Sequence, residues 1–415
     1  NNTILSNIIG LGANGTTDLG NGNDGIEVRS DNNIIGAAGS GNIISGNADD
    51  GIEINAGSTN PQIRGNRIGT NAAGTAAVAN NDNGIELNGN DNVIGGTAAG
   101  QGNLISGNGQ NGIYASQSSA TGNTYLGNFI GTNAAGTSAI ANGAIGILLE
   151  TGASNNIIGG TAANAGNLIS GNAQSGVYID FNSTGTQVLG NRIGLNNTGT
   201  AALANGGDGI TVRNGSTGTI IGNGTAAGRN ILSGNTGIAI NFDSGSNNGT
   251  VRGNWIGLNA AGTGTITSGG GIAIFGTSNH VIGGSAVGHG NIIAGTSGAG
   301  IQLAIAPCTN NSIQGNWIGV LADGTTAAGN ALDGIRIIGG PSNNRIGGEN
   351  AGEGNIIANN GFDGIRADDG TGNRFLRNSI YDNAGLGIDL QNNDIPNPND
   401  NLDPDNGANL RQNFP

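Results

Sequence analysis

The stretch that decides the fold runs from Gly84 to Ala115 and reads GIELNGNDNVIGGTAAGQGNLISGNGQNGIYA. Three short apolar phrases, IEL, VIG and LIS, are separated in it by runs of Gly, Asn, Ala and Gln, and a fourth phrase, IYA, repeats the first. Apolar residues at alternate positions predict strands with one buried face, and the Gly and Asn runs predict tight turns. The stretch therefore predicts three short strands and a return to the starting position.

The same pattern recurs along the whole chain. The phrase Gly-Ile-x-apolar or its Val variant occurs thirteen times from Gly25 to Gly387, and between successive phrases lie one Asn-x-apolar phrase and one further strand-like phrase. Apart from the first and last, the steps between these glycines alternate between 28–30 and 33–34 residues. A repeat of this length with three strands is one coil of a solenoid. The sequence thus predicts an all-β protein, a right-handed parallel β-helix with three sides and about twelve coils.

Two parts of the chain differ in composition. Residues 1–390 carry the repeat and are expected to form the solenoid, whereas residues 391–415 are rich in Asn, Asp and Pro and are expected to close the last coil. In this segment Asp394, Asp400, Asp403 and Asp405 gather oxygen ligands around sharp turns, which makes them a candidate Ca²⁺ site. An acidic, solvated tail is the alternative. No other cofactor is expected.

The Asn of the Asn-x-apolar phrase recurs once per coil. Stacked Asn side chains can donate and accept along the row, which satisfies polar groups at a buried corner. We predict such a structural ladder for Asn42, Asn66, Asn103, Asn128, Asn167, Asn191, Asn230, Asn254, Asn291, Asn316, Asn355 and Asn378.

Composition excludes several classes of protein. Gly makes up 85 of 415 residues and aromatic residues 3 %, so the interior must be narrow. The net charge of −14 and the lack of a basic stripe argue against nucleic acid as a partner. The chain has no 18-residue apolar run, so no membrane insertion is expected. The single Cys308 allows no internal disulfide and is expected to be a small buried residue, not a nucleophile.

The phrases NxIGGTAAGxGNxISGN and GIDL…DPDNGANLRQNFP resemble the bacterial right-handed parallel β-helix repeat proteins, which are secreted or lie at the cell surface. The resemblance covers essentially the whole chain. It implies the fold named above and a place inside a large extracellular or cell-surface protein. The fold hosts both scaffolds and polysaccharide-active proteins, so the resemblance does not assign a chemistry.

The outward residue of each Gly-Ile phrase shows what one sheet presents to solvent. Acidic residues stand at the start of this row, apolar and aromatic residues in the middle and basic residues towards the end. From the first phrase to the last, the row reads Glu27, Glu53, Glu86, Tyr114, Leu148, Tyr178, Thr211, Ala239, Ala273, Gln302, Arg336, Arg366 and Asp389.

A polysaccharide-active protein on this fold needs a groove, carboxylates and a nearby cation. Arg336 and Arg366 lie far from the Glu residues in the row, so we assign no catalytic residue. Two tryptophans stand at equivalent places two coils apart, where covering a neighbouring loop is the alternative to stacking on a sugar. The candidate glycan-binding residues are Glu53, Glu86, Tyr114, Tyr178, Trp255 and Trp317.

His280 and His289 flank one insertion, HVIGGSAVGHG, nine residues apart. Two imidazoles at this spacing can contribute to a metal site, but no third ligand stands near them in the sequence. We therefore expect both histidines to lie in a surface loop.

These observations favour an extracellular structural scaffold, an elongated solenoid segment that serves as a stalk, an adhesin or a filament element, and not an enzyme. The expected location is extracellular or at the bacterial cell surface. The expected partners are other surface or matrix proteins or glycans, and exposed strand edges at the solenoid ends also predict head-to-tail self-association. The alternative is a carbohydrate-active enzyme, such as a polysaccharide lyase or hydrolase, or a tailspike-like glycan-binding protein that uses the Glu and Tyr residues of one sheet.

Overall fold

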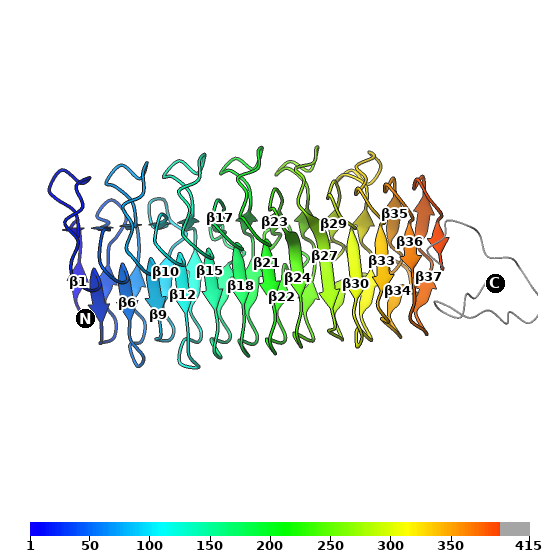
Figure 1. Cartoon of the computed structure of the whole chain (residues 1–415), viewed down its shortest axis with the longest axis horizontal. Coiled ribbons are helices and arrows are strands. Elements are labelled where there is room, and N and C mark those ends of the chain that lie inside the picture. Colours follow the sequence, from blue (N-terminus) through cyan, green and yellow to red (C-terminus); the bar gives the residue numbers. More distant parts are fainter. Residues whose placement is uncertain (391–415) are drawn as a thin grey trace, which may run out of the picture. The chain divides into compact units, whose positions relative to one another are not determined.

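A computed structural model describes residues 1–390 of the chain. These residues form two compact units: Asn1–Thr219 with Gly234–Thr236, and Ile220–Ser233 with residues 237–390. Both units consist of short parallel strands joined by turns (Figure 1). Three strand positions alternate along the chain, and each occurs 13 times. The described residues contain no helix.

In the first unit, three parallel sheets hold seven strands each. Sheet one contains β1 (Thr3–Ile4), β4 (Ile34–Ile35), β7 (Gln62–Ile63), β10 (Val93–Gly95), β13 (Thr124–Leu126), β16 (Ile157–Gly159) and β19 (Gln187–Leu189). Sheet two contains β2 (Ile8–Ile9), β5 (Ile43–Ile44), β8 (Arg67–Ile68), β11 (Leu104–Ile105), β14 (Phe129–Ile130), β17 (Leu168–Ile169) and β20 (Arg192–Ile193). Sheet three contains β3 (Ile26–Val28), β6 (Ile52–Ile54), β9 (Ile85–Leu87), β12 (Ile113–Ala115), β15 (Ile147–Leu149), β18 (Val177–Ile179) and β21 (Ile210–Val212).

The second unit repeats this arrangement with six strands at each position. Its sheet-one strands are β22 (Ile220–Ile221), β25 (Thr250–Val251), β28 (Val281–Gly283), β31 (Ser312–Gln314), β34 (Arg345–Gly347) and β37 (Arg374–Leu376). Its sheet-two strands are β23 (Ile231–Leu232), β26 (Trp255–Ile256), β29 (Ile292–Ile293), β32 (Trp317–Ile318), β35 (Ile356–Ala358) and β38 (Ser379–Tyr381). Its sheet-three strands are β24 (Ile238–Phe242), β27 (Gly270–Phe275), β30 (Ile301–Ala304), β33 (Ile335–Ile338), β36 (Ile365–Ala367) and β39 (Ile388–Asp389).

The predicted right-handed parallel β-helix is therefore confirmed, and all thirteen Gly-Ile phrases become strands of sheet three. In β6, Ile52 and Ile54 are fully buried, while Glu53 between them faces outward. Ile52 pairs with Ile85, and Ile85 pairs with Ile113, so the isoleucines of successive coils stack about 4.8 Å apart. This stacking gives each unit a continuous apolar interior built mainly from Ile, Leu and Val side chains.

One coil departs from the predicted register. Ile240 pairs with Ile272 and Asn241 with Ala273, so the outward residue of β24 is Asn241 and not Ala239. Ala239 is fully buried, and the register of β24 and β27 places it opposite Gly271. The segment GIAINF holds two overlapping apolar-x-apolar phrases, and the second one buries the large Phe242 ring inside the coil. Burial of the larger apolar surface explains this choice of register.

Two kinds of loop leave the coils at different corners. The loop of each long coil follows a sheet-two strand, and within each unit successive loops of this kind are joined by hydrogen bonds. The amide of Ala134 donates to Gly74 O over 2.9 Å in the first unit, and the amide of Ala322 donates to Gly262 O over 3.2 Å in the second. The loop of each short coil precedes a sheet-two strand. Both sets of loops therefore flank sheet two.

Candidate functional site

The floor row, defined here as the outward residues of sheet two, has a regular composition. From Ile43 to Ile356, short coils contribute aliphatic side chains and long coils contribute Arg or aromatic side chains; Ile8 and Ser379 at the two ends of the row depart from this rule. In the first unit the paired residues are Ile43, Arg67, Leu104, Phe129, Leu168 and Arg192. In the second unit they are Ile231, Trp255, Ile292, Trp317 and Ile356.

The loops of the long coils pack against the floor row. A Cβ atom added to Gly262 would lie 2.8 Å from Cη2 of Trp255, and one added to Gly324 would lie 3.1 Å from Cη2 of Trp317. Both glycines have positive φ angles, so neither the backbone nor the space admits a larger residue. The two tryptophans thus contact the loops with one edge of each ring and stay partly exposed. Covering a neighbouring loop is the alternative role that the sequence analysis gave for them.

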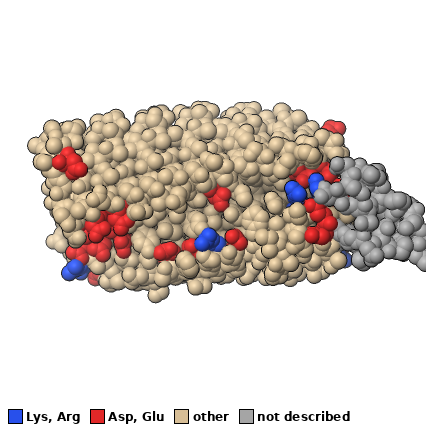
Figure 2. All heavy atoms as spheres, in the orientation of Figure 1, with Lys and Arg blue, Asp and Glu red and all other residues tan. Residues whose placement is uncertain are grey.

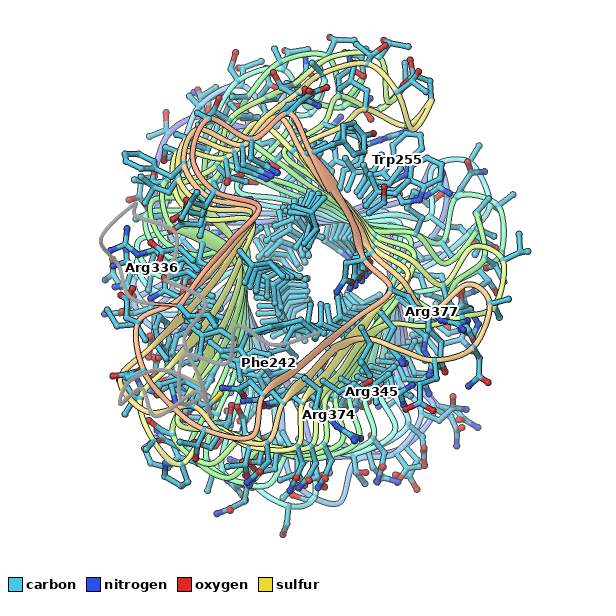
Figure 3. All side chains as sticks on the ribbon, turned by 90° about the vertical axis from the view of Figure 1, so that its right-hand side faces the viewer. Phe242, Trp255, Arg336, Arg345, Arg374 and Arg377 are labelled. Atoms are coloured by element: carbon cyan, nitrogen blue, oxygen red, sulfur yellow. The ribbon has the colours of Figure 1, made fainter. Side chains whose placement is uncertain are left out.

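A cavity of about 400 Å³ opens over the floor row of the second unit. Trp255, Ile292 and Trp317 line its base, Ala322 lines one side, and the loop around Val287 lines the other. Figure 3 shows Trp255 in the recess between two groups of projecting loops. The recess is therefore apolar at its base and bounded by backbone-rich loops.

Arg229 brings a positive charge into this cavity. Its guanidinium carbon lies 4.1 Å from the centroid of the Trp255 ring, and its Nε donates to Gly253 O over 3.2 Å. Burial lowers the pKa of Arg229, but an arginine remains charged at neutral pH. Equivalent positions in other short coils hold Gly, as at Gly290 and Gly354, so this cation is specific to one coil.

The first unit carries a second cavity, of about 600 Å³, over its own floor row. Arg67, Leu104 and Phe129 line the base, and Ala134 of a long-coil loop lines one side. Among the described residues that line the two cavities, none is Asp or Glu. In a chain with a net charge of −14, these recesses are therefore unusual in carrying arginine without carboxylates.

A group of acidic residues without neighbouring arginines, apart from Arg29, lies on a different face, over the first coils of sheet three (Figure 2). Glu27, Glu53 and Glu86 pair in successive strands. Carboxylate oxygens of Asp24, Asp49 and Asp50 lie within 4.8 Å of one another, and such oxygen donors suit Ca²⁺. Because of burial first, and then the hydrogen bond and charge of Glu86, the pKa of Asp50 rises to about 8.

Both candidate tyrosines are held by charged partners on sheet three. The hydroxyl of Tyr114 donates to Glu150 Oε1 over 2.6 Å, and burial together with this carboxylate raises the pKa of Tyr114 to about 12. The Arg213 guanidinium lies 5.4 Å from the centroid of the Tyr178 ring and 3.5 Å from Asp180. These contacts hold both tyrosine rings against the sheet.

The six candidate glycan-binding residues therefore lie on two different faces. Glu53, Glu86, Tyr114 and Tyr178 belong to sheet three of the first unit, and Trp255 and Trp317 belong to sheet two of the second. The sequence analysis missed the residues that complete the floor row. The second position of the Asn-x-apolar phrase carries the signal, because in long coils it is always Arg or aromatic from Arg67 to Trp317.

The twelve Asn of the Asn-x-apolar phrase form hydrogen-bonded rows within each unit. Nδ2 of one Asn donates to Oδ1 of the next over 2.8–3.0 Å, in the series Asn42, Asn66, Asn103, Asn128, Asn167 and Asn191, and again in the series Asn230, Asn254, Asn291, Asn316, Asn355 and Asn378. A further row that the sequence analysis did not identify includes Asn80, Asn108 and Asn142. These amides satisfy backbone groups at the corners of the coils.

The expectation that both histidines lie in a surface loop is wrong for His280. Its ring is fully buried, accepts from the Gly249 amide at Nδ1 over 3.0 Å and lies 3.0 Å from Thr277 Oγ1 at Nε2. His280 stands where the next coils have Asn311 and Asn344, so it takes an Asn position in a corner row. His289 lies in the short-coil loop. Cys308 is buried, and burial raises the pKa of its thiol to about 12.

The candidate Ca²⁺ ligands Asp394, Asp400, Asp403 and Asp405 lie outside the described residues. The solenoid predicted for residues 1–390 covers the described range, and the closing role of residues 391–415 stays a prediction.

Comparison with known proteins finds similarity only in three dimensions. No family model and no curated protein matches the chain. A mutant of a periplasmic alginate epimerase superimposes with a TM-score of 0.49 at 14% identity, covering 88% of this chain and 74% of the other. The A-module of a mannuronan C-5 epimerase from Azotobacter vinelandii gives 0.42 at 13% identity, with 88% and 83% covered. A tailspike protein gives 0.38 at 16% identity, with 82% and 62% covered.

These solved structures correct the function favoured by the sequence analysis. By name they are epimerases of alginate or mannuronan and a tailspike, and they agree with the alternative, a carbohydrate-active or glycan-binding protein, better than with a structural scaffold. The scaffold interpretation took the absence of a catalytic constellation on sheet three as decisive, and of sheet two it considered only Trp255 and Trp317. At this level of identity the similarity shows the fold alone, a parallel β-helix.

Proposed function

We propose that this chain is a glycan-binding protein that holds an acidic polysaccharide over sheet two. The observation that carries the proposal is the floor row, in which each long coil from Arg67 to Trp317 presents Arg or an aromatic ring between two sets of loops. The proposal rests on these residues and not on the similarity to solved structures.

The chemistry of the floor row suits a sugar polymer. The partly exposed rings of Trp255 and Trp317 offer apolar surface for the C–H face of a pyranose ring, with a small entropy cost because the loops already hold their edges. One face of the Trp255 ring is covered by the guanidinium of Arg229. The surrounding loops present backbone N–H and C=O groups, which can hydrogen-bond to hydroxyl groups. Such a site suits a carbohydrate ligand better than it suits a purely apolar one.

The charges favour an acidic polymer. Arg67 and Arg229, which line the two cavities, point to the recognition of carboxylates, because a guanidinium pairs with a carboxylate through two hydrogen bonds. The acidic cluster of Asp24, Asp50 and Glu86 lies on sheet three and not over the floor row. A negatively charged polymer would therefore meet attraction in the groove despite the net charge of the chain.

Titration calorimetry with the whole chain tests this function. We expect polyuronates such as alginate or polygalacturonate to bind and neutral dextran not to bind. Trp255→Ala should weaken binding, while Phe362→Ala, which changes an exposed aromatic residue of the same unit away from the groove, should not. Absence of binding to every acidic polysaccharide in a broad panel would refute the proposal.

A carbohydrate-active enzyme is the second candidate, and the acidic face is the observation that favours it. With its raised pKa, Asp50 keeps a proton at neutral pH beside the Glu86 carboxylate. A carboxyl group that keeps its proton at neutral pH can act as a general acid, which chemistry at a glycosidic bond requires. New reducing ends or changed uronate stereochemistry, measured by NMR and lost in Glu86→Gln, would establish turnover. Unchanged polymer after long incubation would leave binding as the function.

We also propose an extracellular or cell-surface location, since polysaccharides of this class lie outside the cytoplasm. Residues 1–390 contain no helix that is long and apolar enough to cross a membrane. Detection of the native protein on intact cells with an antibody would test the location.

A further inference from the structure

The floor row has a repeat of two coils, and we infer that it selects an extended 1→4-linked polysaccharide with one disaccharide for each pair of coils. This inference rests on the proposed function and adds the geometry of the ligand. It concerns each unit separately.

The spacing follows from the strand pairing. In the second unit Trp255 pairs with Ile292, and Ile292 pairs with Trp317. Neighbouring strands lie about 4.8 Å apart, so equivalent atoms of the two tryptophans are about 10 Å apart along the stack. The first unit repeats this spacing from Arg67 to Phe129, with Leu104 between them.

The side chains between the platforms are lower. Ile292 and Leu104 are 8% and 7% exposed, whereas Trp255, Trp317 and Phe129 are more exposed. The floor therefore alternates between a raised platform and a shallow aliphatic seat. A ligand that fits it must change its contacts with the same alternation.

The loops beside the floor have the same repeat. Ala72 donates to Gly15 O, Ala134 to Gly74 O and Asn197 to Gly136 O, each over 2.8–2.9 Å in the first unit. These hydrogen bonds join loops that are two coils apart. One complete environment of floor and wall therefore recurs every two coils, and not every coil.

An extended chain of pyranose rings joined through equatorial bonds at C1 and C4 has a matching period. Successive rings turn over, so every second ring presents the same face, and two rings advance the chain by nearly the distance of two coils. One ring of each disaccharide would stack on a platform, and the other would lie over the aliphatic seat. A 1→3-linked chain curves and loses this match after a few rings.

Binding of oligosaccharides of defined length tests the register. The probes are β-(1→4)-linked glucuronic acid oligomers of two to eight sugars, with carboxymethylated β-(1→3)-glucan oligomers of equal length and charge for comparison. For the first series we expect affinity to rise in steps of two sugars, and for the second we expect weaker binding without steps. Equal gains for every added sugar, or equal binding of both series, would overturn the register but leave acidic glycan binding intact. If neither series nor any acidic polysaccharide binds, the proposed function itself fails.

A single platform can be removed without emptying the space under the loop. Trp317→Leu should lower affinity for the longest β-(1→4) oligomers about three- to tenfold. It should also reduce, by two sugars, the oligomer length at which affinity stops rising. Trp317→Phe should restore most of the affinity, and Phe362→Leu serves as the matched control. Thermal unfolding identifies a misfolded variant. A folded Trp317→Leu protein with an unchanged saturation length would contradict the inference.

Discussion

Arg229 stacks on Trp255, with the guanidinium carbon 4.1 Å from the ring centroid, and the two side chains line the same cavity. The stacking leaves the guanidinium edge available for an anionic ligand, because a cation over an aromatic face keeps its N–H groups in the plane. The pair thus combines a sugar platform with a carboxylate donor.

Arg229→Ala should weaken the binding of an acidic polysaccharide about three- to tenfold, and Arg229→Lys should recover only part of the loss, because Lys lacks the planar fork. Calorimetry at several salt concentrations measures both effects, and we expect the difference from wild type to shrink as salt rises. Arg374→Ala removes an exposed arginine of the same unit outside the cavity and is the control. An equal loss in both alanine variants would show that net charge, and not this site, attracts the polymer.

The Asn row should contribute strongly to stability. Asn128 donates to Asn167 Oδ1 and Ile94 O and accepts from Asn103, all within the buried corner. Asn128→Ala leaves several of these groups unpaired, at a cost of at least about 2 kcal/mol in the free energy of unfolding. Asn197→Ala is the matched control, because the equivalent loop positions are Ala72 and Ala134. Urea denaturation that gives the two variants the same stability would argue against a structural role for the row.

Much of the fold could be predicted because each coil repeats the same local rule. The alternation in Ile-x-Ile buries two side chains in every coil, and Gly and Asn provide the turns. The rule failed where one segment offered two registers: in β24, Phe242 is buried and Asn241 takes the place expected for Ala239. Packing inside the coil selects one of the two possible registers, and this packing cannot be inferred from a short sequence phrase alone.

The groove could not be found in the same way. Its floor combines Arg67, Phe129, Trp255 and Trp317, which share no motif and come together only through the pairing of sheet two. The outward row of sheet three was easier to read because Gly-Ile marks it, and it led to the Glu and Tyr residues. Arg229 was missed because it replaces a glycine, and its contact with Trp255 depends on the neighbouring coil.

His280 should make the second unit sensitive to acid. Burial lowers its pKa to about 4, while an unfolded chain binds the proton near the ordinary value of 6.5. Between these values the unfolded state binds more protons, so the stability present above pH 6.5 is lost as the pH falls towards 4, by about 3 kcal/mol in all. The buried ring packs against Phe242, with centroids 4.4 Å apart, and cannot reach water to charge.

His280→Asn should abolish this part of the acid sensitivity, because Asn is the residue that the next coils use at this corner, as Asn311 and Asn344. The measurement is the difference in unfolding free energy between variant and wild type at pH 7 and pH 4, which cancels the contribution of the carboxylates. His289→Asn should change this difference much less, since that ring is only partly buried in a loop. The same pH dependence in wild type and His280→Asn would show that the buried ring does not limit stability.

Asp50 should impose the opposite pH dependence on the first unit. Its Oδ1 accepts from the amide and Nδ2 of Asn83 over 2.8 and 3.1 Å, as an Asn in a corner row would, and its carboxyl group shares a hydrogen bond with Glu86. The pKa of about 8 lies above the ordinary value of 3.8, so the folded state holds a proton that the unfolded chain releases. The contribution of Asp50 to stability is therefore full below pH 3.8 and decreases as the pH rises towards 8.

Asp50→Asn replaces the shared proton with an amide donor and should increase the melting temperature relative to wild type progressively from pH 4 to pH 8. Asp49→Asn, at the exposed neighbouring position, should leave the slope unchanged. If the gain from Asp50→Asn were the same at both pH values, a proton shared with Glu86 could not be its origin.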